Sequence, residues 1–464
     1  MTLEVLNTRV HQDLAWLAYG GETWVPPLTR PAGHVYDVVI IGGGQSGLGS
    51  AFGLLRERIS NILVIDENPQ GFEGPWDTYA RMQTLRSPKH LTAIDFGVPS
   101  LTFRAYYEAC HGAQAWESLD KAARLDWMAY LRWYREVLNL PVQNDTRLLK
   151  IEPKAGLYHL QTSQGLLLSR KVILATGIQG GGEWHVPDFI SRSVPRHLYA
   201  HTSESLDFET LKGKKIAILG AGASAFDNAH HALSKGVAEA HVYVRRARLP
   251  TVNPIRQMEV SGMIARFTAL SDSDKYAVMS AFFERNQPPT NDMFERASGF
   301  PGFSLHLGSP WQALEASSKG VKITTPHGQD LFDFLIVSTG LVTDPALRPE
   351  LEDLAPDILR WSDRYSPPDA IKNPLIDAHP YLSEGFGFLG RDAESSQKLR
   401  GVFAFNYSGL ISFGLSASAL SGLRFALTNL IKTVADQLFQ DSRDQLLADY
   451  YAYAEPEFTA VWPR

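Results

Sequence analysis

Two stretches of the chain repeat the same short pattern, and this repetition constrains the fold more than any other feature. Residues 36–48 read YDVVIIGGGQSGL, and residues 214–226 read KKIAILGAGASAF. Each is a β-branched apolar run that ends in a Gly-x-Gly-x-x-Gly/Ala turn, followed by apolar residues at helical spacing. A strand, a glycine turn and a helix in this order form the unit that binds a dinucleotide. The sequence therefore predicts an α/β protein with two Rossmann-like dinucleotide-binding domains.

The first turn carries all three glycines of the pattern. Gly42 permits the tight turn, Gly44 lets the backbone approach a pyrophosphate, and Gly47 lets the helix pack closely on the strand. The next apolar strand ends in Asp66 and Glu67, about 25 residues later, near the spacing at which a carboxylate binds an adenosine ribose. Because a carboxylate there repels a 2′-phosphate, this turn is predicted to bind FAD or NAD.

The second turn is followed by a strand that ends in basic residues. Gly220, Gly222 and Ala225 repeat the geometry of the first turn, with alanine in the third place. Arg245 and Arg246 stand where an acid would be expected. Arginines at a strand end are commonly just solvated, but a guanidinium here can also clamp a 2′-phosphate through charge-assisted hydrogen bonds. The second site is therefore predicted to bind NADPH rather than NADH.

Two further strands indicate how the domains are connected. KVILATG at residues 171–177 follows the first unit, and FDFLIVSTG at residues 332–340 follows the second. Their Thr-Gly ends are Thr176, Gly177, Thr339 and Gly340. This order predicts that the NADPH-binding domain is inserted into the FAD-binding domain. The expected division is an N-terminal extension (1–33), the first part of the FAD-binding domain (34–205), the NADPH-binding domain (206–325), and the second part of the FAD-binding domain with a C-terminal helix (326–464).

Outside these units, apolar spacing predicts helices over residues 8–19, 124–138 and 430–453. Residues 341–400 are rich in proline, aspartate and serine, which predicts irregular surface structure. Within that segment we expect a solvated acidic face formed by Glu350, Glu352 and Asp353.

Composition excludes several classes of function. The lone Cys110 allows no internal disulfide, no dithiol exchange and no cysteine-rich zinc or iron–sulfur site. A formal net charge of -6 at pH 7 does not favour a nucleic-acid partner. The most apolar long stretch, residues 401–427, contains Arg424 and several polar side chains, so we expect no membrane span. Because the N-terminus lacks a signal-peptide pattern, we expect a cytoplasmic protein.

Two dinucleotide sites in one chain predict a bound flavin and a diffusing nicotinamide cofactor. NADPH would reduce FAD, which must then pass its electrons on. Because the chain has no dithiol, the electrons must pass from the flavin to molecular oxygen or to a soluble acceptor. Two functions stay open at this point: a monooxygenase that oxygenates a small-molecule substrate, and an NAD(P)H-dependent flavin oxidase or reductase that oxygenates nothing.

The order of the glycine motifs and Thr-Gly strands resembles the class B flavin-dependent monooxygenases, which hold FAD and NADPH in two domains. Several stretches are similar to the N-hydroxylating branch of that family. They are Ala80–Gln83 with Lys89–Thr92, Pro99–Phe103 with Tyr106, Gly222–Ala225 with Asp227, Val252-Asn253, and Asn406 with Gly409. Gly74-Pro75-Trp76 matches the Gly-x-Trp near the flavin in the wider group.

The resemblance implies roles for particular residues. Gln83 would lie beside the flavin ring, Lys89 would face the substrate, Asn253 would lie near the substrate, and Asn406 belongs to the closing flavin segment. The predicted catalytic residues are Asn253, Gln83, Asn406 and Lys89. The predicted cofactor-binding residues are Gly42, Gly44, Gly47, Asp66, Glu67, Trp76, Gln83, Thr176, Gly177, Gly220, Gly222, Ser224, Ala225, Arg245, Arg246, Thr339, Gly340 and Asn406.

The resemblance also implies the reaction: a flavin hydroperoxide oxygenates a small molecule at nitrogen or another soft nucleophile. The sequence departs from the motifs of these branches at two places. Pro254 stands where the N-hydroxylating branch has a glutamate, so the carboxylate clamp of ornithine and lysine hydroxylases is not expected. Ahead of His201, Pro195 and His197 replace the Baeyer–Villiger fingerprint. Amines, sulfides, ketones and heterocycles all stay open as substrates.

Overall fold

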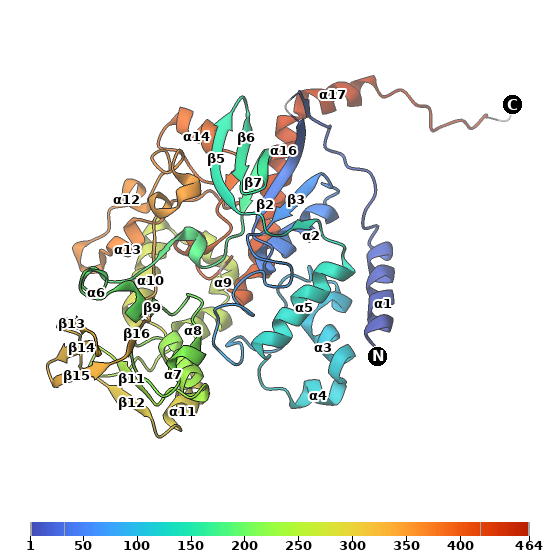
Figure 1. Cartoon of the computed structure of the whole chain (residues 1–464). Coiled ribbons are helices and arrows are strands. Elements are labelled where there is room, and N and C mark those ends of the chain that lie inside the picture. The colour runs from blue at the N-terminus through green and yellow to red at the C-terminus, as the bar shows by residue number, and fades with distance from the viewer. Residues whose placement is uncertain (1, 32, 418, 463–464) are drawn as a thin grey trace.

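The computed structural model describes residues 2–31, 33–417 and 419–462, and it is built around two separate sheets (Figure 1). The larger sheet contains β1 (Thr29–Arg30), β2 (Gly33–Ile41), β3 (Ile62–Ile65), β4 (Val142–Gln143), β5 (Leu148–Lys154), β6 (Leu157–Thr162), β7 (Gly165–Leu174) and β18 (Val402–Phe403). Its order is β4-β3-β2-β7-β6-β5, with β1 beside β2 and β18 beside β7. Strands β2, β3, β4, β7 and β18 pair in parallel, whereas β5, β6 and β7 form an antiparallel meander.

Strand β2 lies in the middle of the larger sheet and is covered by helices. Residues 38–40 have no exposed surface, as expected for a parallel strand buried on both faces. Helix α2 (Gln45–Arg56) follows β2 and packs on α16 (Leu420–Asp441). The two helices approach closely because Gly53 has no Cβ, which would lie 2.7 Å from Ile431 Cγ1.

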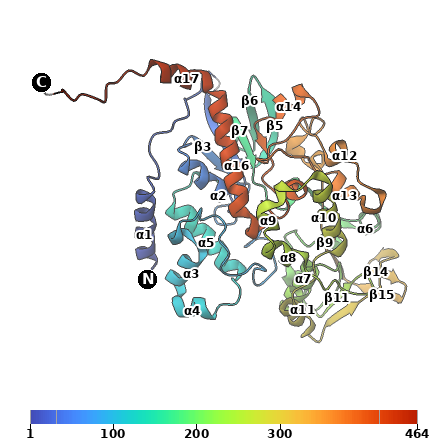
Figure 2. The same cartoon turned by 180° about the vertical axis from the view of Figure 1, so that it is seen from behind.

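An aromatic helical layer covers one flank of this unit (Figure 2). It consists of α1 (Leu3–Trp16), α3 (Phe103–His111), α4 (Ala113–Ser118) and α5 (Arg124–Val137). Helix α5 occupies nearly the predicted range, and its aromatic side chains are buried, as expected for a core role. Helix α1 begins five residues before the predicted helix, because the Thr2 side chain accepts a hydrogen bond from the Val5 amide and caps it. The N-terminal extension therefore packs on α3 through Leu6, Val10 and Leu14.

The smaller sheet is entirely parallel. It contains β9 (Tyr199–His201), β10 (Lys215–Leu219), β11 (Glu239–Tyr243), β12 (Phe303–His306) and β16 (Phe334–Val337), in the order β12-β11-β10-β16-β9. Helices α7 (Ala223–Ser234) and α11 (Asn291–Ser298) pack together against it. An antiparallel meander of β13 (Ala313–Ser317), β14 (Gly320–Thr325) and β15 (Gly328–Phe332) and the short helix α6 (Asp188–Ser193) lie beside it.

Two strands of the smaller sheet lie outside the interval 206–325 expected for the NADPH-binding domain. Strand β9 precedes that interval and β16 follows it, and β16 pairs directly with β10, with Ile216 opposite Phe334. A short apolar strand has the same hydrophobic pattern in either sheet, so the sequence does not predict which sheet β9 and β16 join. Strand pairing extends the smaller sheet from residue 199 to residue 337. The pair β8 (Gly182–Trp184) and β17 (Leu341–Thr343) then links the chain segments that leave and re-enter it.

A second apolar core forms where the inserted segment returns to the larger unit. Helices α8 (Pro254–Val260), α9 (Met263–Arg266) and α10 (Asp272–Arg285) pack here with α12 (Trp361–Arg364), α13 (Pro374–Asp377) and α15 (Leu410–Phe413). The prediction of irregular surface structure over residues 341–400 is therefore wrong in part. The segment is irregular, with α14 (Ala393–Leu399) as its longest helix, but Trp361 and Ile376 have no exposed surface. Because the buried residues of this segment do not recur at a regular spacing, hydrophobic periodicity does not predict their burial.

The predicted C-terminal helix over 430–453 is two helices. Helix α16 begins ten residues earlier, at Leu420, and its apolar face is buried on α2. After Ser442 the separate helix α17 (Arg443–Ala452) projects from the body and has no buried residue (Figures 1 and 2). Within the described part of the chain, no helix has both the length and the apolarity to cross a bilayer.

The turn between β2 and α2 brings backbone segments so close that only glycine fits. A Cβ on Gly47 would lie 1.8 Å from the Gly42 carbonyl oxygen, and a Cβ on Gly42 would lie 2.5 Å from the Ala175 carbonyl oxygen. Gly42 also has a φ of +107°, which favours glycine. Gly44 is different, because the nearest atom to its Cβ would be Gly74 Cα at 3.8 Å.

Gly47→Ala is expected to lower the free energy of unfolding by about 1–3 kcal/mol, because the clashing atom is backbone and cannot rotate away. Gly44→Ala, the matched control in the same turn, should lower it by less than about 1 kcal/mol. Urea unfolding of the two variants without added cofactor measures both values. Equal losses would contradict the close-packing role of Gly47.

Candidate functional site

A cavity of about 840 Å³ runs from the first glycine turn toward helix α8 of the inserted segment. Its walls come from distant parts of the chain: the β2–α2 turn, the end of β3, the loop before residue 80, the end of β7, and the segments around residues 253–259 and 287–290. The predicted residues on these walls are Gly42, Gly44, Asp66, Glu67, Trp76, Thr176, Gly177 and Asn253. The sequence therefore located the cavity from several independent segments.

The first glycine turn fits the pyrophosphate of a dinucleotide. Gly44 caps helix α2 without any side-chain hydrogen bond, so the first N–H groups of the helix are left for a ligand. The positive end of the helix dipole lies at the same place. Because a Cβ on Gly44 would meet little protein, the space beside it is open to a phosphate group.

The two acids after β3 have different environments. Asp66 is buried, and its carboxylate accepts hydrogen bonds from the Gly43 amide at 2.7 Å and the Asn68 amide at 2.8 Å. Burial raises the pKa of Asp66, and these hydrogen bonds offset only part of that rise. Glu67 is exposed and pairs with Arg147 at 2.8 Å. Asp66 therefore fixes the glycine turn, whereas the Glu67 carboxylate is not committed to the backbone.

Asn406 supports the cavity wall from behind. It is buried, and its Nδ2 donates to Thr176 Oγ1 at 3.1 Å and to the Gly180 carbonyl at 3.2 Å. Its Oδ1 accepts from the Ser408 amide at 2.9 Å. Asn406 does not line the cavity, but it holds the segment that carries Thr176 and Gly177, which do.

The second glycine turn repeats the geometry of the first. Gly220 has a φ of +152°, and its Cβ would lie 2.4 Å from the Ser338 carbonyl oxygen. Gly222 caps α7 without a side-chain hydrogen bond and has open space beside it. Buried Ala225 lies inside the helix, and Ser224 is exposed at its start. The first turn of α7 is thus free for a second phosphate-bearing ligand.

Of the predicted residues beyond this turn, some already hydrogen-bond to the protein backbone and one does not. Arg245 is exposed, whereas Arg246 donates to the Glu284 carbonyl at 2.9 Å. Thr339 donates through its hydroxyl to the His185 carbonyl, and the Gly340 carbonyl accepts from the His185 amide at 2.9 Å. Arg245 is therefore the uncommitted guanidinium, and Thr339 and Gly340 anchor the segment that returns from the smaller sheet.

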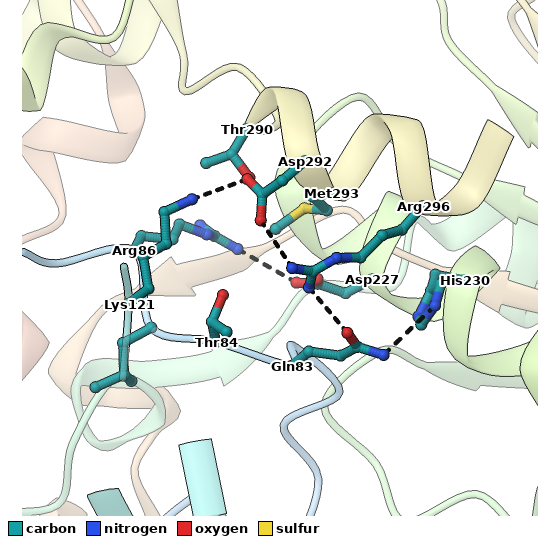
Figure 3. Close-up of a pocket in the computed structure, with 11 residues that line it drawn as sticks. Gln83, Thr84, Arg86, Lys121, Asp227, His230, Thr290, Asp292, Met293 and Arg296 are labelled. Carbon is teal, nitrogen blue, oxygen red and sulfur yellow. Dashed lines mark hydrogen bonds and ion pairs between the residues drawn. The ribbon is translucent and has the colours of Figure 1, made fainter. Parts of the chain in front are cut away.

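Gln83 and Lys89 lie outside the lining of the large cavity. Gln83 lies in a smaller cleft, where its Oε1 accepts from Arg296 at 2.9 Å (Figure 3). The Lys89 ammonium donates to the Trp116 carbonyl at 2.7 Å and the Glu117 carbonyl at 3.2 Å, at the end of α4. Neither residue lines the large cavity. The partners of both side chains come from helices α4 and α11, far from the motif in the sequence.

Asn253 is the predicted catalytic residue that does lie on the cavity wall. It caps helix α8, and its Oδ1 accepts from the Ile255 amide at 3.1 Å. Because the side-chain oxygen of Asn253 already accepts this hydrogen bond, its Nδ2 group is the one that can donate to a ligand. Pro254 occupies the first position of the helix, where its missing N–H costs nothing.

Several wall residues were not predicted. Glu350 was expected on a solvated face, but it is only 7% exposed, pairs with Arg348 at 2.8 Å and lines the cavity. Glu352 and Asp353 are exposed, as expected. Arg348, two residues before Glu350, was the available signal, but one nearby residue of opposite charge in an irregular segment does not show burial. Arg86, Arg256 and Gln287 also lie on the wall.

Figure 3 shows a polar network where the segment around residue 84 meets the inserted unit. Lys121 pairs with Asp292 at 2.9 Å, and Arg86 pairs with Asp227 at 3.4 Å. Burial raises the pKa of Asp227 to about 6. Its ionisation therefore disfavours folding above about pH 6, and this penalty disappears below the ordinary aspartate pKa. Among the described residues, no group of histidine, cysteine and acidic side chains could hold a metal ion.

Arg245→Ala is expected to raise the KM for NADPH by about tenfold and to leave the KM for NADH nearly unchanged, because only the 2′-phosphate needs a free guanidinium. Arg246→Ala is the neighbouring control and should have the smaller effect, since its guanidinium is tied to a carbonyl. Steady-state kinetics with both nucleotides decide the matter. An unchanged preference in the Arg245 variant would exclude this residue as the phosphate clamp.

Known proteins share both the sequence and the fold described above. Residues 39–283 match the family model of pyridine nucleotide-disulphide oxidoreductases. A FAD-dependent urate hydroxylase from Xanthomonas campestris pv. campestris is 57% identical over 467 residues, which cover 100% of this chain and 99% of the relative.

Solved structures show the same architecture at low sequence identity. The ornithine hydroxylase of Pseudomonas aeruginosa is 17% identical with a TM-score of 0.67, over 87% of this chain and 100% of that chain. The flavin-containing monooxygenase of Stenotrophomonas maltophilia is 18% identical with a TM-score of 0.56, over 87% of this chain and 99% of that chain. These likenesses confirm the predicted fold of two dinucleotide-binding sheets.

The family model covers more than half of the chain, and the hydroxylase aligns with all of it. The predicted enzyme class and the predicted cofactors are confirmed, although the single Cys110 departs from the disulphide chemistry in the family's name. The chain belongs to the pyridine nucleotide-disulphide oxidoreductase family and, within it, to the class B flavin-dependent monooxygenases, which use FAD with NADPH as co-substrate.

Proposed function

We propose that this enzyme hydroxylates urate, with NADPH and molecular oxygen as co-substrates. The observation that carries the proposal is the 57% identity, over the whole chain, to a FAD-dependent urate hydroxylase. The overall reaction consumes urate, O2, NADPH and a proton, and it yields hydroxylated urate, NADP+ and water. One oxygen atom enters the product, and the other leaves as water with the two electrons supplied by NADPH.

The residues of the first glycine turn would hold FAD. The N–H groups at the start of α2 bind the pyrophosphate, with Gly42 and Gly44 shaping the approach. Glu67 accepts from the ribose hydroxyls, because Asp66 is engaged with the turn. Thr176, Gly177 and Trp76 complete the wall, and Asn406 positions Thr176. Bound FAD supplies the redox chemistry, taking up hydride and activating dioxygen.

The second glycine turn would hold NADPH. The start of α7, with Gly220, Gly222 and Ser224, binds the pyrophosphate, and Arg245 binds the 2′-phosphate. One nucleotide would then bind at each sheet. The large cavity reaches from the first sheet to α8 of the inserted segment, which supports a reaction space between the two nucleotide sites.

The cavity wall supports a heterocyclic substrate over an amino-acid amine. Lys89 is engaged with two backbone carbonyls, and Pro254 replaces the glutamate of the N-hydroxylating branch. The wall instead offers amide groups at Asn253 and Gln287 beside apolar Met82, Leu85 and Ile255. A wall that combines apolar side chains with hydrogen-bonding groups is typical of small-molecule sites. A planar ring with alternating N–H and C=O groups fits such a surface.

We also place the reaction in the cytoplasm. The proposal requires a continuous supply of reduced nicotinamide, and the exposed Cys110 has no partner cysteine in the sequence. Both features are typical of a reducing compartment.

The test is to measure urate consumption, NADPH oxidation and hydrogen peroxide release by the FAD-loaded protein. We expect one urate to disappear for each NADPH oxidised, with little peroxide. NADPH oxidation that yields an equal amount of peroxide and leaves urate unchanged would support the oxidase alternative instead. L-Ornithine, a primary amine, is the matched control and should not be consumed.

A further inference from the structure

Two arginines of one short segment have very different surroundings. Arg81 is buried, and its guanidinium donates to the Thr202 and Glu204 carbonyls, each at 2.7 Å. Five residues later, Arg86 lines both the large cavity and the adjoining cleft. Its Nε is buried and has no hydrogen-bond partner among the residues that the structure describes. Arg81 is thus structurally satisfied, whereas Arg86 keeps unused donors.

The partner of Arg86 holds it only loosely. The Nη2 of Arg86 lies 3.4 Å from Asp227 Oδ2, longer than the roughly 2.7–2.9 Å of a strong charge-assisted bond. In Figure 3 the side chain of Arg86 extends toward Asp227. The Asp227 carboxyl is nearly buried, and its pKa is raised to about 6 because Arg86 offsets the cost of burial only in part. A guanidinium with five N–H donors and one long contact can accept another anionic partner.

The surroundings of Arg86 in the large cavity match a planar, oxygen-rich anion. Asn253 presents an amide on the same wall, and Gln287 and Thr290 add polar groups to it. Uric acid is ionised to the urate monoanion at neutral pH, and its charge is shared among oxo groups that accept hydrogen bonds in the plane of the ring. The rigid fork of an arginine fits such an edge better than the point charge of a lysine.

Building on the proposed function, we infer that Arg86 is the specificity-determining residue of this enzyme, and that its guanidinium binds an oxo edge of the urate anion. Asp227 is its positioning residue, holding the side chain at the cavity wall when the substrate is absent. The site thereby selects anionic oxopurines over neutral or cationic molecules of similar size. A cationic amine bound there would meet the like charge of Arg86.

The experiment measures equilibrium binding of urate to the oxidised, FAD-loaded protein without NADPH, by titration of the flavin absorbance. Arg86→Gln is expected to weaken urate binding about 10- to 100-fold, the effect of losing a charge-assisted contact. Arg86→Lys should recover only part of it, because the charge returns without the planar fork. Flavin content and thermal unfolding verify that both variants are folded.

Lys121→Gln is the matched control. It removes a positive charge from the same cleft, where Lys121 pairs with Asp292, but Lys121 does not line the large cavity. Its affinity for urate should equal that of the unaltered protein. The affinity for NADP+ should be the same in all variants.

The outcomes separate this inference from the proposed function. Equal urate affinity in the unaltered protein and Arg86→Gln overturns the role of Arg86 and leaves urate hydroxylation standing. Weakened NADP+ binding with unchanged urate binding overturns it too. Urate that binds through Arg86 but is never hydroxylated overturns the proposed function and keeps the anion site. An unaltered protein that binds no urate overturns both.

Discussion

The structure depends on close backbone contact at two glycine turns. At the first, Gly42 lies against the Ala175 carbonyl, and at the second, Gly220 lies against the Ser338 carbonyl, both within distances that exclude a side chain. These contacts hold each turn against the end of the neighbouring strand, β7 or β16, and the first N–H groups of α2 and α7 are unoccupied by any capping side chain. One packing constraint, used twice, therefore shapes both glycine turns in the way that a dinucleotide site requires.

The segment after residue 78 bridges the two units beside the large cavity. Arg81 donates to carbonyls just after β9, and Arg86 meets Asp227 on α7. Helices α8 to α10 return to pack on the larger unit, and α8 lines the cavity from the other side. The enzyme thus contributes orientation and enclosure, while the bound cofactors contribute the redox chemistry.

The sequence predicted those parts of the site that depend only on residues close together in the chain. The glycine turns, the apolar strands and helix α5 could be located from the sequence, because each has a period or spacing of its own. The hydrogen-bond partners of Gln83 and Lys89 could not be predicted, because Arg296 and Trp116 are brought to them by tertiary packing. The burial of Glu350 likewise depends on Arg348 and on tertiary packing rather than on any repeat.

The most direct test of the central claim is a single turnover of urate under labelled dioxygen. A monooxygenase should place one atom of labelled oxygen in the hydroxylated product, and none should come from water. Product without label, or label found only in hydrogen peroxide, would contradict the account.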